Sequence, residues 1–291
     1  MQVSANGIAI EVDDSGPAGA EPVLLIMGLG MQLIAWPDEL VRELVERGFR
    51  VVRFDNRDVG LSQGFDHLGF PSLLAASVRY MLRLPIRGPY RLADMASDAF
   101  GVLDALRIER AHVCGVSMGG MIAQHMAASR PERVKSLTLT MTSSGSRALP
   151  QATAKARRVL LARPANPRDR AAIVDHLVRL LTVIGSPGYP PDPVELRRRC
   201  EAFVARAWRP AGTVRHLVAV AADGDRSSML ARIHVPTRIV HGAADPLIPV
   251  PAAHDLLRRI RGATIDVIDG MGHDLPAALM PRLARAIGAA N

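Results

Sequence analysis

The residues with the clearest chemical potential form a Gly-Val-Ser-Met-Gly pentad at residues 115–119. A serine hydroxyl is a weak nucleophile at neutral pH, so it attacks a carbonyl only with the help of a base. The pentad lies between an apolar run, residues 111–115, and a helical pattern, residues 118–129, which is the strand–turn–helix setting of a nucleophile elbow. Glycines two positions before and after the serine leave room for the strained turn. This context predicts that Ser117 is the nucleophile of an acyl-transfer reaction.

The partners of this serine follow in the chain order Ser, Asp, His. Asp245 comes shortly after a strand-like run at residues 237–241, and His273 follows another at residues 264–268. Both loops would lie at the carboxyl edge of a parallel sheet, where such sheets place their ligands. We therefore predict that His273 is the base and that Asp245 orients its imidazole. Asp274 adjoins His273 and would point elsewhere, which makes it a weaker candidate for the acid.

Acyl transfer also needs hydrogen-bond donors for the oxyanion. One donor should be the backbone N–H of Met118, at the start of the helix after the nucleophile. The second should be the N–H of Leu29, in a glycine-containing loop after the first long strand. That loop is not a dinucleotide-binding fingerprint, because Leu33 stands where a third glycine is required. No histidine or cysteine pattern typical of zinc sites is present, so we expect neither a cofactor nor a metal.

The elements that must position these loops alternate between strands and helices. This alternation predicts a doubly wound, mostly parallel sheet that is covered by helices on both faces. The expected strands are residues 23–26, 51–54, 111–115, 134–140, 237–241 and 264–268, and the expected helices are a segment opened by Pro37 and residues 92–106, 118–129, 252–260 and 281–287.

The alternation stops after residue 142, and residues 147–229 are arginine-rich, helical in pattern and without an evident strand. The simplest organisation is a core of residues 1–142 and 230–291 with an inserted helical lid, residues 143–229. Apolar lid side chains could line the substrate pocket or form ordinary lid core; the candidates are Leu177, Leu180, Leu181, Phe203 and Trp208.

A second insertion covers residues 71–85, where apolar side chains alternate with arginines. Such a helix could dock on a membrane surface, line a substrate entrance, or simply pack on its neighbours. The net charge of +8 rests almost entirely on arginine. It suggests an anionic partner, or else a solvated arginine-rich surface. No nucleic-acid-binding motif accompanies the charge, so we do not expect nucleic acid as a partner.

Length and composition are ordinary for a globular protein. The chain has 291 residues, of which 48% are hydrophobic and 22% are charged. Its two cysteines, Cys114 and Cys200, are too few for a disulfide scaffold. There is no signal-peptide pattern at the N-terminus and no apolar run long enough to span a membrane, which favours a cytoplasmic location. The sequence leaves the oligomeric state open.

These motifs together resemble the α/β-hydrolase superfamily over nearly the whole chain. The pentad, Asp245 after a His-Gly segment, and His273 in Gly-Met-Gly-His correspond to that superfamily's triad. Met27-Gly28, the Trp-Pro-Asp-Glu run at residues 36–39 and Arg57-Asp58 are more narrowly similar to the aclacinomycin methylesterase group and related bacterial carboxylesterases and lipases. Residues 121–124 are also similar to enol-lactonases and cofactor-free haloperoxidases. The resemblance implies an α/β-hydrolase fold.

Together, the motifs and the resemblance predict a serine esterase of the carboxylesterase or lipase type. It would hydrolyse small to medium, largely apolar esters through an acyl-enzyme. A lactonase or a cofactor-free perhydrolase or haloperoxidase could use the same triad. A ligand receptor with slow turnover is an alternative of another class. Serine at position 117 argues against epoxide hydrolases and haloalkane dehalogenases, which use aspartate as nucleophile.

Overall fold

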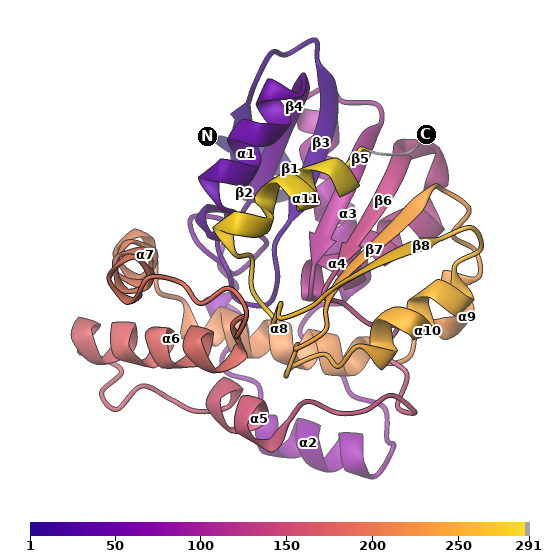
Figure 1. Ribbon diagram of the computed structural model, residues 1–291. Coiled ribbons are helices and arrows are strands. Elements are labelled where there is room, and N and C mark those ends of the chain that lie inside the picture. Colours follow the sequence, from indigo (N-terminus) through magenta and orange to yellow (C-terminus); the bar gives the residue numbers. More distant parts are fainter. Residues whose placement is uncertain (289–291) are drawn as a thin grey trace.

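An eight-stranded sheet forms the centre of the computed structural model, which describes residues 1–288 (Figure 1). The strand order is β1-β2-β4-β3-β5-β6-β7-β8. The pairs β1–β2 and β2–β4 are antiparallel, and every other neighbouring pair is parallel. The strands are β1 (Gln2–Ala5), β2 (Ile8–Ser15), β3 (Glu21–Ile26), β4 (Phe49–Phe54), β5 (Ala111–Val116), β6 (Val134–Thr140), β7 (Thr237–Gly242) and β8 (Thr264–Ile268).

Helices cover both faces of the sheet. Those of the sheet region are α1 (Asp38–Glu46), α3 (Leu92–Ala105), α4 (Met118–Ser129), α10 (Pro251–Arg259) and α11 (Met280–Ala286). Along β3, Val23 and Leu25 join the apolar cluster under α1 and α11, whereas Leu24 and Ile26 join the cluster under α3, α4 and α10. This alternation follows from the two-residue side-chain period of a strand, and both faces of β3 are buried because helices lie on each side.

Between β6 and β7 the chain forms only helices: α5 (Ala154–Leu160), α6 (Arg170–Ile184), α7 (Pro193–Arg206), α8 (Pro210–Asp223) and α9 (Ser227–Leu230). Helices α5 to α8 lie beyond one end of the sheet, as the expected lid would (Figure 1). Helices α6 and α7 share a small apolar cluster of their own. Leu230, at the end of α9, is instead packed into the core under the sheet.

The doubly wound, mostly parallel sheet and the helical insertion are confirmed. The expected strands and helices are all present, with ends that differ from the expected ones by a few residues. Sequence reasoning missed the N-terminal hairpin of β1 and β2. The segment of residues 71–85 contains helix α2 (Leu73–Met81), which begins after a Ser72 cap and packs against α8.

The structure also places the two cysteines and shows the length of the helices. Cys114 lies in β5 and Cys200 in α7, and both are free and buried. Among the helices of residues 1–288, none is both long and apolar enough to cross a membrane.

Candidate active site

Ser117 occupies a strained turn between β5 and α4. Its backbone angles, φ of 55° and ψ of −119°, lie in a region that residues other than glycine rarely adopt. Two hydrogen bonds hold the turn: its N–H donates to the Thr140 carbonyl at 2.9 Å, and the Thr142 hydroxyl donates to its carbonyl at 2.7 Å. A side chain at Gly119 would place its Cβ 2.0 Å from the Ile26 carbonyl oxygen. The predicted elbow is therefore present, and glycine at this position is a steric requirement.

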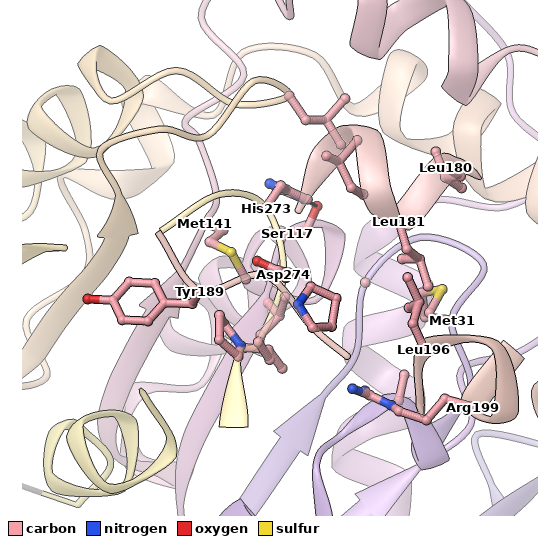
Figure 2. Close-up of a pocket in the computed structure, with 18 of the residues that line it drawn as sticks. Met31, Ser117, Met141, Leu180, Leu181, Tyr189, Leu196, Arg199, His273 and Asp274 are labelled. Carbon is pink, nitrogen blue, oxygen red and sulfur yellow. Dashed lines mark hydrogen bonds between the residues drawn. The ribbon is translucent and has the colours of Figure 1, made fainter. Parts of the chain in front are cut away.

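The structure brings the predicted nucleophile, base and acid together. His273 Nε2 lies 3.1 Å from the Ser117 hydroxyl, and His273 Nδ1 lies 2.7 Å from Asp245 Oδ2. The side chains come from the loops after β5, β7 and β8, as the sequence predicted, and Figure 2 shows Ser117 beside His273. A continuous hydrogen-bonded line from hydroxyl to imidazole to carboxylate results.

The Asp245 carboxylate is held by its own loop. The N–H groups of Leu247 and Ile248 both donate to Oδ1 at 2.8 Å, which leaves Oδ2 for His273. His241 Nε2 lies 3.7 Å from the same Oδ2 but donates to the Ile248 carbonyl at 2.7 Å. Burial lowers the pKa of His241, so this second imidazole stays neutral beside the carboxylate. Asp245 therefore presents one oxygen in a fixed direction.

The two N–H groups predicted as oxyanion donors belong to segments that adjoin the serine. A Cβ at Gly28 would be 3.3 Å from the Ser117 Cβ, so the loop before Leu29 rests against the elbow. Met118 is the first residue of α4, where backbone N–H groups have no partner within the helix. Among residues 1–288, neither the Leu29 nor the Met118 N–H donates a hydrogen bond to the protein. Within the described part of the chain, both N–H groups therefore lack a protein acceptor.

Sequence reasoning missed His216, which supports the loop that carries Leu29. The Gly30 N–H donates to His216 Nδ1 at 3.3 Å, and His216 Nε2 donates to the Arg57 carbonyl at 2.8 Å. Burial lowers the pKa of His216 to about 4, which keeps the ring neutral and able to accept on Nδ1. No local sequence pattern marks this histidine, since its partners are 186 and 159 residues away in the chain.

A cavity of about 440 Å³ opens onto Ser117 and His273 (Figure 2). Leu180 and Leu181 line it, as the sequence suggested. Leu177, Phe203 and Trp208 do not: Leu177 and Phe203 belong to the cluster between α6 and α7, and Trp208 packs against that cluster. The other apolar side chains of the wall are those of Met27, Leu29, Met31, Ala35, Val116, Met141, Leu160, Ile184, Pro190, Pro191, Leu196, Leu247, Leu275, Pro276, Ala277 and Ala278.

Polar side chains are few in this cavity, and sequence reasoning missed most of them. Beyond Ser117 and His273, the polar lining includes Tyr189, Asp192, Glu195, Arg199 and Asp274. The Ser186 hydroxyl donates to the carboxyl of Asp274, whereas the imidazole of His273 is hydrogen-bonded to Asp245. Burial raises the pKa of Asp274. Within residues 1–288, no three His, Cys, Asp or Glu side chains are grouped as a metal site would require.

Known proteins resemble this chain over most of its length. Residues 21–276 match the family model described as the alpha/beta hydrolase fold. The rhodomycin D methylesterase of Streptomyces sp. strain C5 is 32% identical over 93% of this chain and 90% of its own length. A 3-oxoadipate enol-lactonase of Acinetobacter baylyi is 24% identical over 92% of this chain and 87% of its own.

Solved structures show the same fold. A meta-cleavage product hydrolase from Pseudomonas fluorescens matches with a TM-score of 0.72 and 20% identity, covering 98% of this chain and 93% of its own. The narrower resemblance to bacterial methylesterases, inferred from the sequence, is confirmed by the relatives that share about a third of their residues with this chain.

Proposed function

This chain belongs to the α/β-hydrolase family, and from that premise we propose that it is a serine esterase acting on carboxylic esters. The observation that carries the proposal is the line of 3.1 Å and 2.7 Å contacts that joins Ser117, His273 and Asp245. Two free backbone N–H groups and an apolar cavity adjoin this line. Together these groups supply the nucleophile, base, orienting acid and oxyanion donors that acyl transfer needs.

In the first half of the reaction, the Ser117 hydroxyl attacks the ester carbonyl while His273 Nε2 accepts its proton. Asp245 holds the imidazole in the tautomer with hydrogen on Nδ1 and stabilises the imidazolium that forms. The N–H groups of Leu29 and Met118 bind the oxyanion of the tetrahedral intermediate. His273 then donates its proton to the leaving alkoxide, and an acyl-enzyme remains on Ser117.

In the second half, His273 accepts a proton from water, and the resulting hydroxide attacks the acyl-enzyme. The same two N–H groups bind the second oxyanion. Collapse of that intermediate returns the proton from His273 to Ser117 and releases the carboxylic acid. The reaction consumes one ester and one water and yields one acid and one alcohol.

The cavity favours small to medium, largely apolar esters. Most of its wall is aliphatic, and its charged side chains beyond the triad are three acids and one arginine. The positive charge of the chain is therefore not concentrated at the pocket, which argues against selection of acidic substrates. The relative from Streptomyces is by its name a methylesterase, so methyl esters belong among the first substrates to test.

A lactonase is the second candidate, since a lactone is an internal ester that the same groups could open. The similarity to a 3-oxoadipate enol-lactonase supports it. A perhydrolase would differ in using peroxide in place of water. A ligand receptor would bind an apolar ester tightly in the same cavity and turn it over slowly.

A substrate panel separates these candidates. Methyl and p-nitrophenyl esters of increasing acyl length, γ- and δ-lactones, and esters with added hydrogen peroxide would be assayed with the wild-type protein and with Ser117→Ala. We expect ester turnover by the wild type and a fall in kcat of about 10⁴- to 10⁶-fold in the variant. Equal turnover by the two proteins would falsify the esterase proposal. Tight ester binding with negligible wild-type turnover would identify a receptor.

A further inference from the structure

Helix α2 presents an apolar stripe to solvent. Leu74, Val78, Met81 and Leu82 follow the spacing i, i+4, i+7, i+8, which places them on one helix face. Their exposed fractions are 76%, 39%, 71% and 63%, and no residue of α2 is buried. A surface helix of a globular protein normally turns such a stripe toward the core, whereas the stripe of α2 points to solvent.

The stripe is part of a larger exposed apolar area. Leu68 and Phe70 precede the helix and Leu84 follows it, with exposed fractions of 44%, 69% and 45%. Among residues 1–288, eight of the twelve exposed large hydrophobic side chains lie between residues 68 and 84. We call these eight side chains the α2 surface: Leu68, Phe70, Leu74, Val78, Tyr80, Met81, Leu82 and Leu84. Large exposed apolar patches of this kind mark interaction sites.

The positive charge of the chain is concentrated in two segments. Residues 67–93 contain four arginines and no acidic residue, and residues 143–168 contain five arginines, one lysine and no acidic residue. The rest of the chain holds 26 basic and 28 acidic residues. The whole positive excess therefore comes from these two segments, and the first of them carries the α2 surface.

The two segments meet in the structure. The Arg147 guanidinium donates to the Tyr80 carbonyl at 2.9 Å and lies 4.2 Å from the centre of the Tyr80 ring. Figure 1 draws α2 and α5 together at the lower end of the molecule. Leu161, just after α5, is 58% exposed, and Arg157 and Arg158 of α5 are exposed as well. Arg147 thus borders the apolar area, and the other basic side chains of residues 143–168 follow it along the chain.

We propose that the α2 surface and residues 143–168 form a docking site for an anionic lipid bilayer. Exposed leucine, methionine and phenylalanine side chains enter the boundary between headgroups and acyl chains. The surrounding arginines bind lipid phosphates. Residues 67–93 and 143–168 contain no acidic residue that would repel these phosphates. A second copy of this chain is disfavoured as the occupant, because a symmetric contact would place these arginines against each other.

The docking site adjoins the cavity. Leu160 lines the cavity wall, and its neighbour Leu161 is exposed beside the basic side chains of α5. A docked molecule therefore holds its cavity close to the bilayer, where apolar esters dissolve. This consequence for substrate supply rests on the proposed esterase function, whereas docking itself does not.

Vesicle flotation tests the proposal with the full chain. Vesicles would contain phosphatidylcholine alone, or phosphatidylcholine with added phosphatidylglycerol. We expect binding to the anionic vesicles that weakens with rising salt, and little binding to the neutral ones. Leu74→Ser/Met81→Ser/Leu82→Ser, and separately Arg157→Glu/Arg158→Glu, should each lower the affinity by about tenfold or more.

Matched controls lie outside the site. Val194 on α7 is 77% exposed, so Val194→Ser is the control for replacing an exposed apolar side chain by serine. Arg110→Glu/Arg261→Glu is the control for charge reversal on the surface. Both controls should bind vesicles as the wild type does. The triple serine variant should keep wild-type turnover of a water-soluble ester, and Ser117→Ala should keep vesicle binding. The docking proposal and the esterase proposal can therefore be contradicted separately.

Three outcomes would overturn the proposal. The first is absence of wild-type binding to anionic vesicles. The second is equal binding by wild type and both site variants. The third is a dimer in solution, measured by light scattering, that the triple serine variant dissociates, because a second copy would then cover the α2 surface.

Discussion

At the scale of single residues, the candidate site depends on the hydrogen bonds that fix the orientation of each side chain. The two N–H groups on Asp245 Oδ1 fix which oxygen faces His273, and the bonds of Ser117 to Thr140 and Thr142 fix the elbow. Rigid placement matters because proton transfer and attack require hydrogen-bond contact between the reacting groups. The neighbouring acid, Asp274, is diverted to Ser186 and takes no part in this line.

Asp245→Asn should lower kcat for ester hydrolysis by about 10³- to 10⁴-fold. The amide cannot stabilise the imidazolium, and its NH₂ group favours the imidazole tautomer that has no hydrogen on Nδ1. Steady-state kinetics on a p-nitrophenyl ester would measure the loss. Asp274→Asn is the matched control, and its kcat should fall far less. If both variants lost activity equally, the assignment of the acid would be wrong.

At the scale of elements, helix α8 fastens the inserted helices to the loops around the site. Arg215 on α8 forms a buried ion pair with Asp58, in the turn after β4, at 2.7 Å, and Tyr90 donates to the same carboxylate. Burial opposes ionisation of Asp58, but these hydrogen bonds outweigh it and lower its pKa. His216, the next residue on α8, holds the loop of Gly30. One helix therefore connects the turn after β4 with the loop that carries Leu29.

The buried His216 should make folding stability pH-dependent. Its pKa is about 4 in the folded chain and about 6.5 when unfolded, so the unfolded chain binds the proton first as the pH falls. The stability that a neutral His216 contributes is nearly complete above about pH 6.5 and is lost progressively as the pH falls to about 4. Between pH 7 and pH 5 the loss from this residue should be about 2 kcal/mol.

Urea unfolding at the two pH values measures this loss. His216→Gln lacks the titrating ring, so its stability should fall by about 2 kcal/mol less than that of the wild type over the same range. His254→Gln, which removes a histidine from α10, serves as the control and should follow the wild type. Parallel pH profiles for wild type and His216→Gln would show that the ring is not kept neutral by burial.

At the scale of the whole molecule, the apolar interior is divided. Two large clusters lie on the faces of the sheet, and a separate small one joins α6 and α7. The free cysteines report on different parts, because Cys114 is in a sheet cluster and Cys200 is in the small one. Regions with less buried apolar contact open at lower free energy than the core.

Thiol labelling should therefore resolve two openings. In the native protein neither cysteine should react with a disulfide reagent at pH 8, since burial raises the pKa of Cys114 to about 12 and that of Cys200 to about 11. With increasing urea, Cys200 should become reactive before Cys114. Mass spectrometry of the labelled peptides gives the order. Simultaneous exposure of both thiols would mean that α6 and α7 unfold together with the sheet.

Some of the site was already determined by local sequence. The pentad places a serine between a strand and a helix, and runs of apolar residues mark the strands after which Asp245 and His273 come. Because parallel strands align their carboxyl ends, these signals were enough to predict which loops meet. The hairpin of β1 and β2 also had a local signal that was not used: Asn6-Gly7, which takes up positive φ angles of 50° and 77°.

Other features were decided only by tertiary structure. His216 beneath the loop of Gly30, the diversion of Asp274 to Ser186, and the outward turn of the α2 stripe leave no local pattern. The apolar spacing of residues 74, 78, 81 and 82 is the same whether that face is buried or exposed. Periodicity specifies that a helix has an apolar side, but the partner that covers it comes from distant parts of the chain, so only the folded structure decides which way it faces.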